Sequence, residues 1–304
     1  MAEALPISPT SSVPRPSAVL ELLKPLTWFA PMWAYGCGIL SAGQPLTAHL
    51  GVALAGVLLA GPLVCGTSQA VNDWFDRHVD AINEPNRPIP SGRVPGTWGL
   101  RIAFVWTGLS LALAASLGLW VLVAAIVGLA LAWAYSAPPF RLKRNGWFGN
   151  AAVGLCYEGL PWFTAAAALS DGLPDPRIVW LALLYSVGAH GIMTLNDFKS
   201  VGGDTVLGLR SLPVQLGTAA AARLACVVMA VPQIAVVALL MRWERPVHAA
   251  IVGGLLAAQG LLMVRFLAAP RERAAWYNAT GTTLYVLGML ASAFAVRSLI
   301  GGAP

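Results

Sequence analysis

Apolar stretches of about bilayer-spanning length recur along the whole 304-residue chain. Because lipid cannot hydrogen-bond to the backbone, such a stretch of about 20 residues must cross the membrane as a helix. Nine of them can be placed, and they predict an all-α polytopic membrane protein. The expected transmembrane helices are 27–42, 50–71, 99–117, 118–135, 148–169, 177–195, 217–240, 247–267 and 275–299, with the third and fourth divided only around Gly118.

The scarcity of charged residues supports a membrane location. They make up 11% of the chain, whereas a soluble domain carries about 25%. A large soluble core would not explain this deficit, because its surface would still need charge, while lipid around the surface does. The net charge of +6 does not indicate a nucleic-acid partner, because the basic residues neither form runs nor alternate with aromatics.

The distribution of Lys and Arg indicates the orientation. If the N-terminus is cytoplasmic and the C-terminus periplasmic, the only basic residues outside the cytoplasmic segments, of 19 in all, are Arg177, Arg242, Arg245 and Arg297. Such an excess is typical of cytoplasmic loops. Residues 1–24 are rich in Pro and Ser and lack an apolar core, so we expect a flexible cytoplasmic arm there. Residues 25–304 would then form a single transmembrane domain.

Three aspartates, Asp73, Asp76 and Asp80, follow the second apolar stretch. On a helix they fall within an arc of about 60°. Carboxylates this close repel one another unless a cation lies among them. Mg²⁺ prefers oxygen ligands and often completes its coordination with water or substrate phosphate. The spacing therefore predicts a Mg²⁺ site, and the alternative is a solvated helix end with incidental charges.

A second acidic segment, with Asp197 and Asp204, follows the sixth apolar stretch on the same side of the membrane. The two aspartates would share a helix face if the helix continued. Gly202 and Gly203 argue against that, so Asp204 could instead reach the site from a loop. Both acidic segments open with Asn-Asp at corresponding places, which indicates two groups of helices around one shared cavity.

Basic residues in the same cytoplasmic segments suit a strongly anionic substrate such as a diphosphate. Metal can bridge carboxylate to phosphate while basic side chains neutralise the outer oxygens. The candidates are Arg77, Arg87, Arg93, Lys143, Lys199 and Arg210. Some of them would serve only the charge asymmetry of the membrane protein.

The acidic motifs resemble those of a known family. Asn72-Asp-x-x-Asp76-x-x-x-Asp80 and the following Ala-Ile-Asn-Glu-Pro-Asn-Arg-Pro-Ile-Pro-Ser-Gly-Arg resemble the UbiA-type intramembrane prenyltransferase superfamily. Tyr135-Ser-Ala-Pro-Pro-Phe-Arg-Leu-Lys143 and Lys24-Pro25 extend the match. The stretch 196–204 and Gly-Leu-Arg-Ser-Leu-Pro-Val-Gln-Leu-Gly at 208–217 look like the chlorophyll and bacteriochlorophyll synthase branch, most of all its bacteriochlorophyll members.

The resemblance covers the chain from about residue 20 to its end, and it implies a fold and a site. The fold would be a bundle of nine transmembrane helices around a central cavity that opens to the cytoplasm and laterally to lipid. The catalytic metal ligands would be Asp73, Asp76 and Asp80 at a first Mg²⁺-diphosphate site, and Asp197 and Asp204 at a second. The residues expected at the diphosphate are Asn72, Arg77, Arg87, Arg93, Tyr135, Ser136, Lys143, Asn196, Lys199 and Arg210.

One departure concerns Gly202, where the pattern of that branch has an acidic residue. The second site would therefore offer two carboxylates instead of three, which leaves the number of bound Mg²⁺ ions open.

The resemblance also implies a reaction. A geranylgeranyl or phytyl group would pass from its diphosphate to the propionate carboxylate of bacteriochlorophyllide, with Mg²⁺ as cofactor. A carboxylate with a pKa of about 4 is already ionised near neutral pH. No general base is then required, and the chain has no evident Ser-His-Asp or Cys-His arrangement. The expected location is the bacterial inner, photosynthetic membrane, with contacts to other pigment-biosynthesis or photosystem-assembly proteins.

Two polar residues inside expected transmembrane helices are candidates for binding the tetrapyrrole. Glu158 lies near the middle of the fifth, where ionisable groups are costly and often functional. His190 precedes Asp197 by two helical turns and could ligate the magnesium of a pigment. An ordinary structural role is the alternative for both.

Two rival functions remain open from the sequence. The first keeps the chemistry but changes the acceptor to chlorophyllide, a quinone precursor or haem. The second is a transporter, which would carry its polar site near the middle of the membrane. The carboxylates here lie at helix ends on one side, so the sequence favours the enzyme.

Overall fold

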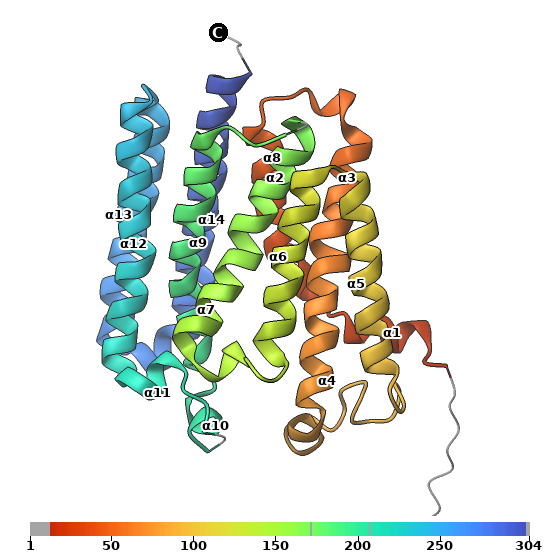
Figure 1. Cartoon of the computed structure of the whole chain (residues 1–304). Helices are drawn as coiled ribbons and strands as arrows, with labels where there is room; N and C mark the ends of the chain where they lie inside the picture. Colours follow the sequence, from red (N-terminus) through yellow and green to blue (C-terminus); the bar gives the residue numbers. More distant parts are fainter. Residues whose placement is uncertain (1–12, 171, 207, 302–304) are drawn as a thin grey trace, which may run out of the picture.

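The computed structural model describes residues 13–170, 172–206 and 208–301, and these ranges contain helices and turns without a β-strand. The α-helices, labelled in Figure 1, are α1 Pro16–Leu22, α2 Phe29–Ser41, α3 Leu50–Leu58, α4 Gly66–Asn83, α5 Trp98–Ser116, α6 Leu119–Ser136, α7 Gly146–Gly154, α8 Leu160–Ser170, α9 Pro176–Asp197, α10 Val201–Val206, α11 Leu212–Leu216, α12 Thr218–Arg242, α13 Pro246–Ala268 and α14 Pro270–Ile300.

Two π-helical segments make longer rods from these helices. The segment η3, Leu59–Cys65, joins α3 to α4, and η5, Leu155–Gly159, joins α7 to α8. Pro62 lies inside η3, and its missing N–H disturbs a regular α-helical ladder. A π-helical turn also rotates the following side chains around the helix axis, so these segments change which faces meet the neighbouring helices.

Seven helices in the described ranges are long and apolar enough to cross a membrane. They are Leu50–Asn83, Trp98–Ser116, Leu119–Ser136, Pro176–Asp197, Thr218–Arg242, Pro246–Ala268 and Pro270–Ile300. They confirm seven of the expected stretches and the division at Gly118. The other two expected stretches are helical but fall outside this set, because α2 has 13 residues and the α7–η5–α8 rod carries Asn150 and Glu158.

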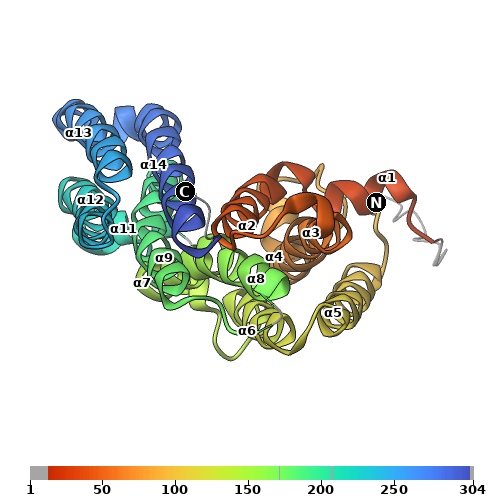
Figure 2. The same cartoon turned by 90° about the horizontal axis from the view of Figure 1, so that it is seen from above.

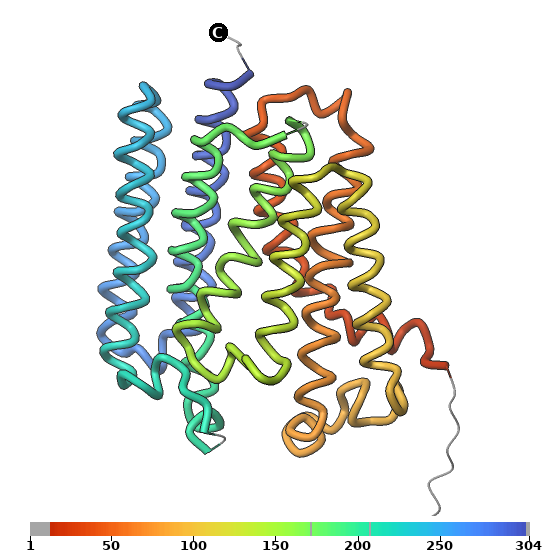
Figure 3. The backbone as a smooth tube through the Cα atoms, in the orientation of Figure 1, coloured from red at the N-terminus to blue at the C-terminus, as the bar shows by residue number. Residues whose placement is uncertain are grey.

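The axes of the long helices are roughly aligned with one another. The described chain begins near one end of the bundle and ends at the other. In Figures 1 and 3, α1 lies near the lower end and the last turn of α14 at the upper end. The end-on view of Figure 2 places α12 and α13 at one side and α5 at the other. The C-terminal end of α4 and the short helices α10 and α11 share the end of the bundle that carries α1.

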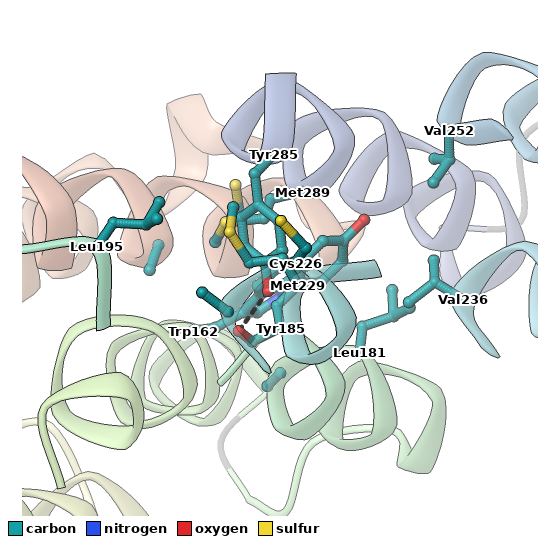
Figure 4. Packing of buried hydrophobic residues seen from close by; sticks show 14 of the residues in the cluster. Trp162, Leu181, Tyr185, Leu195, Cys226, Met229, Val236, Val252, Tyr285 and Met289 are labelled. Atoms are coloured by element: carbon teal, nitrogen blue, oxygen red, sulfur yellow. Dashed lines mark hydrogen bonds between the residues drawn. The ribbon is translucent and has the colours of Figure 1, made fainter. Parts of the chain in front are cut away.

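The largest buried cluster joins α2, α8, α9, α12, α13 and α14 (Figure 4). Trp162, Tyr185 and Tyr285 are fully buried in it. The Tyr285 hydroxyl donates to the Tyr185 carbonyl oxygen at 2.6 Å, and the Tyr185 hydroxyl pairs with Ser292 Oγ at 2.8 Å. Interhelical hydrogen bonds of this kind stabilise helix packing where apolar contact alone gives little preference.

Gly38 on α2 provides a test of this packing. A Cβ atom there would lie 2.4 Å from the Trp162 carbonyl oxygen, whereas a Cβ at Gly36, on the same helix, would meet nothing within 4 Å. We expect Gly38→Ala to destabilise the protein by about 1–3 kcal/mol because backbone must shift, and Gly36→Ala to leave the melting temperature unchanged or raise it. Thermal unfolding of both variants in one detergent measures the difference, and equal melting temperatures would contradict this account of the α2–α8 contact.

The expected flexible arm is ordered in the part that the structure describes. Within 1–24, residues 13–24 include α1, whose Leu22 is fully buried. Glu21 forms an ion pair with Arg93 in the loop after α4. These contacts, which are distant in sequence, join residues 13–24 to the bundle. Residues 1–12 lie outside the described residues.

Candidate active site

The first acidic cluster lies on α4, at the end of the bundle that also carries α1 (Figure 1). The helix continues past its apolar part to Asn83, so Asp73, Asp76 and Asp80 occupy one continuous helix. Asp73 is 1% exposed and Asp80 7% exposed. Carboxylates buried to this extent need charged or hydrogen-bonding partners.

Asp73 and Asp80 receive such partners from two different segments. Lys24 Nζ lies 2.6 Å from Asp73 Oδ1. Arg87 Nη1 lies 2.9 Å from Asp80 Oδ2 and 3.4 Å from Asp73 Oδ1, so one guanidinium spans both carboxylates. Glu84 holds the same guanidinium through Nε at 2.6 Å and Nη2 at 2.8 Å.

Asp76 has a separate basic partner. Lys143, in the 3₁₀ turn Leu142–Arg144, places Nζ 2.5 Å from both carboxylate oxygens of Asp76. Burial lowers the pKa of Lys143, and the neighbouring charge of Asp76 opposes this shift. Asn72 Nδ2 is 3.1 Å from Asp76 Oδ2 and 3.2 Å from Ser136 Oγ, which links α4 to the end of α6.

The second acidic segment lies at the end of α9. Asp197 is its last residue and accepts a hydrogen bond from Asn150 Nδ2 on α7 at 3.1 Å. Asp204 lies on the short helix α10 and accepts from Ser200 Oγ at 2.9 Å. The structure therefore places Asp204 neither in a continued α9 nor in a loop, because the chain turns after Asp197 and forms a new helix.

The two acidic segments border the same region. Lys143, which contacts Asp76, directly precedes α7, and Asn150 of α7 contacts Asp197. The start of α7 and the turn before it thus link the two acidic segments.

The carboxylates fit Mg²⁺ by their chemistry. In the described part of the chain, no three His, Cys, Asp or Glu side chains are already gathered as a metal site. The donors are nevertheless all hard oxygens, which Mg²⁺ prefers. Asp73 Oδ2 is buried and has no hydrogen-bond partner among the described residues. A metal ion bound there would replace the ammonium and guanidinium groups that now neutralise these carboxylates.

The structure separates the candidate basic residues into two groups. Arg87 and Lys143 contact the aspartates directly. Arg77 instead stacks over the ring of Trp74 at 4.1 Å, and Arg93 pairs with Glu21. Lys199 and Arg210 are exposed. The uncharged candidate Asn196 contacts α14, because its Oδ1 accepts a hydrogen bond from Asn278 Nδ2 at 2.9 Å.

Sequence reasoning did not identify Lys24 and Asn150 as site residues. Lys24 precedes Pro25, which starts a 3₁₀ turn before α2 and directs the lysine toward α4. Asn150 was visible as an amide inside an apolar stretch, which requires a partner in a membrane. That partner, Asp197, is distant in sequence and becomes apparent only in the fold.

Two cavities meet beside this site. The first, the α4–α6 cavity, has a volume of about 210 Å³ and reaches from Asn72 and Tyr135 at its polar mouth to Ala60 and Val64 in the apolar interior. The second, the α2–α14 cavity, has a volume of about 410 Å³. Tyr157 lines both and accepts a hydrogen bond from Gln69 Nε2 at 3.2 Å.

The two residues considered for a pigment lie in different places. Glu158 lines the α2–α14 cavity and is 5% exposed. His190 lies outside the lining of the described cavities, with its ring 5.9 Å from that of Trp147 on α7. The expectation that His190 faces a bound pigment is therefore not supported by its position.

Comparison with known proteins identifies the family to which this sequence belongs. The sequence model of the UbiA prenyltransferase family matches residues 27–296. The bacteriochlorophyll synthase 33 kDa chain of Cereibacter sphaeroides is 58% identical over 95% of this chain and 95% of its own. The chloroplastic chlorophyll synthase of Oryza sativa is 37% identical, covering 91% of this chain and 76% of its own.

A solved structure shares the architecture at low sequence identity. The UbiA homolog from Archaeoglobus fulgidus bound to GPP and Mg²⁺ has a TM-score of 0.70 and 19% identity, covering 88% of this chain and 99% of its own. The family match spans nearly the whole helical bundle and both acidic segments. This chain belongs to the UbiA prenyltransferase family.

Proposed function

We propose that this enzyme transfers a geranylgeranyl or phytyl group from its diphosphate to the propionate carboxylate of bacteriochlorophyllide. The observation that carries the proposal is the group of ion pairs made by Lys24, Arg87 and Lys143 with the α4 aspartates, beside the mouth of an apolar cavity. The acceptor is inferred from the 58% identity to a bacteriochlorophyll synthase chain.

The α4–α6 cavity suits a prenyl diphosphate. Its polar mouth includes Asn72, which contacts Asp76, while Ala60 and Val64 surround its inner part. A neighbouring cavity lined by Ala124 and Ala125 shares these inner residues and extends the apolar space toward α8. A long hydrocarbon tail could lie there with its diphosphate at the carboxylates.

The aspartates and the basic residues act on the leaving group. Bound Mg²⁺ would supply charge stabilisation to the departing diphosphate. Asp73, Asp76 and Asp80 would hold the metal, and Asp197 and Asp204 would complete the site from α9 and α10. Once released from the carboxylates, Lys24, Arg87 and Lys143 would neutralise phosphate oxygens. Such contacts lower the barrier because they strengthen as negative charge develops in the transition state.

The acceptor needs positioning more than activation. An ionised propionate oxygen would form a bond to the allylic C1 atom as the bond from C1 to the diphosphate oxygen breaks, so the product is an ester and free diphosphate. No proton has to be removed from the acceptor. The chain therefore has to exclude water and align the carboxylate with C1.

The topology proposed for this activity has nine crossings in a single domain from about residue 25 to 304. The described chain starts and ends at opposite faces (Figure 3), which requires an odd number of crossings, and α2 and the α7–η5–α8 rod supply the two beyond those of spanning length. The acidic segments would face the cytoplasm, around a cavity open on that side. A bacterial photosynthetic inner membrane is the corresponding location.

An esterification assay tests the acceptor. Purified protein would be incubated with bacteriochlorophyllide, geranylgeranyl diphosphate and Mg²⁺, and the esterified pigment measured by chromatography. We expect ester formation with stoichiometric release of diphosphate. Parallel reactions with chlorophyllide and with a hydroxybenzoate test the rival acceptors. Prenylation of the hydroxybenzoate without any pigment ester would refute the proposed acceptor while retaining the family chemistry.

A further inference from the structure

The α2–α14 cavity is separate from the apolar space assigned to the prenyl tail. It lies between α2, α7, η5, α9 and α14, and it shares Val153, Tyr157 and Met193 as wall residues with the α4–α6 cavity. At its outer edge, Leu26 is 92% exposed and Phe29 63% exposed. In a membrane protein such exposed apolar side chains face lipid, so this cavity is accessible to a ligand that partitions into the bilayer.

The cavity has polar groups at two opposite places. Near the acidic site, Asn196 Oδ1 accepts from Asn278 Nδ2, and Asn196 immediately precedes Asp197. Deeper in the membrane, Glu158 lines the cavity. Asn150 contacts Asp197, and Glu158 follows Asn150 by eight residues on one rod, so Glu158 lies about 12 Å farther along the axis.

Glu158 is a buried residue of the cavity wall, and the local backbone fixes its position. The residue is 5% exposed, and in the part of the chain that the structure describes its Oε2 atom has no hydrogen-bond partner. It lies in η5 and is followed by Gly159, where a Cβ atom would come 2.2 Å from Ser186 Oγ. The glycine allows η5 to approach α9 closely, and the π-helical turn sets the direction of the glutamate.

The lack of a counter-charge indicates which form of Glu158 is present. An ionised carboxylate buried without a partner would cost several kcal/mol, whereas a neutral carboxylic acid can remain and donate one hydrogen bond.

The other cavity walls favour a flat aromatic ligand. Phe29 and Trp33 line one side with ring centroids 5.9 Å apart, and Trp33 Nε1 donates to the Val286 carbonyl oxygen at 3.2 Å.

From this geometry we infer that the α2–α14 cavity binds the tetrapyrrole ring of the acceptor, with neutral Glu158 donating a hydrogen bond to a carbonyl on the ring edge far from the propionate. The inference rests on the proposed function, because it identifies the acceptor side of the same site. The two polar places match the two ends of such a molecule. The propionate would lie by Asn196, next to the diphosphate site, and a peripheral carbonyl would lie by Glu158.

Equilibrium binding of bacteriochlorophyllide to Glu158→Leu, Glu158→Gln and His190→Ala tests this inference. We expect Glu158→Leu to raise the dissociation constant about tenfold, since it removes one buried hydrogen bond. The amide of Glu158→Gln can still donate, so binding should stay within about threefold of the unaltered protein. His190 is a matched control, because it is a polar side chain inside the bundle but outside the cavity, and its removal should leave binding unchanged.

A vibrational measurement separates a direct contact from a general structural effect. A hydrogen bond lowers the stretching frequency of the pigment carbonyl, so resonance Raman spectra should show the band at its free position in Glu158→Leu only. An unchanged dissociation constant and band in Glu158→Leu would overturn the inference. Loss of binding in Glu158→Gln equal to that in Glu158→Leu would also overturn it, because the carboxylate itself would then be required. Failure of the unaltered protein to bind bacteriochlorophyllide would instead reject the proposed function.

Discussion

Replacing Asp73 with Asn is expected to reduce the rate of pigment esterification by about two to three orders of magnitude. Asp73 is the most buried of the α4 aspartates, and its Oδ2 atom is unpaired among the described residues. The substitution keeps the size of the side chain but removes its negative charge. A neutral amide is a much weaker ligand for Mg²⁺ than a carboxylate. The Mg²⁺ concentration needed for half-maximal activity should therefore rise together with the loss of rate.

Asp175→Asn is the matched control for this change. Asp175 caps the N-terminus of α9 and pairs with Arg177 at 2.7 Å. Asn is an equally good cap, so the fold should be retained. Activity within about threefold of the unaltered enzyme is expected, because a partly exposed ion pair contributes little. If Asp73→Asn retained as much activity as Asp175→Asn, the assignment of α4 as the metal-binding helix would fail.

Hydrophobic pattern and residue spacing were sufficient to predict much of the fold. The spans that the structure confirms are long apolar segments whose helical state is forced by lipid, and Gly118 divides two of them with a φ of 122°. The three aspartates of α4 lie on one helix, as their helical spacing predicts. These features depend on neighbours in sequence.

Features that depend on distant contacts could not be predicted. The position of α1 depends partly on the Glu21–Arg93 pair, which links residues 72 positions apart.

The face shared by His190 and Asp197 could be predicted, but not what covers it. Both residues face the same neighbour, α7, as their spacing predicts, since they contact Trp147 and Asn150. That face is packed helix surface at His190, while the cavity lies on the side of Ala189 and Met193. Periodicity identifies a face but not what covers it.

The same limit applies to the basic residues of the loop after α4. Arg87 and Arg93 have the same charge and lie in one short segment, so sequence alone does not show which of them belongs to the site. The structure distinguishes them by their partners. Arg87 spans Asp73 and Asp80, whereas Arg93 lies at the surface on Glu21 of α1. Their contributions to the reaction should differ accordingly.

We therefore expect Arg87→Gln to lower the esterification rate by about two orders of magnitude, and Arg93→Gln to lower it by less than about threefold. Removing Arg87 leaves buried aspartates without their guanidinium and removes a bidentate donor that can turn to the diphosphate when metal binds. Removing Arg93 breaks only an exposed ion pair. The two variants have the same change in net charge, so a general electrostatic effect on the membrane surface would affect both equally.

Steady-state kinetics with varied geranylgeranyl diphosphate at saturating Mg²⁺ will measure both variants. A role for Arg87 at the leaving group predicts a lower kcat together with a higher KM for the diphosphate, because the interaction strengthens as charge develops. Equal losses in the two variants would mean that the ion pairs do not report which arginine meets the phosphate. A loss confined to Arg93→Gln would place the diphosphate nearer to α1 than to α4, and the arrangement of the site would have to be redrawn.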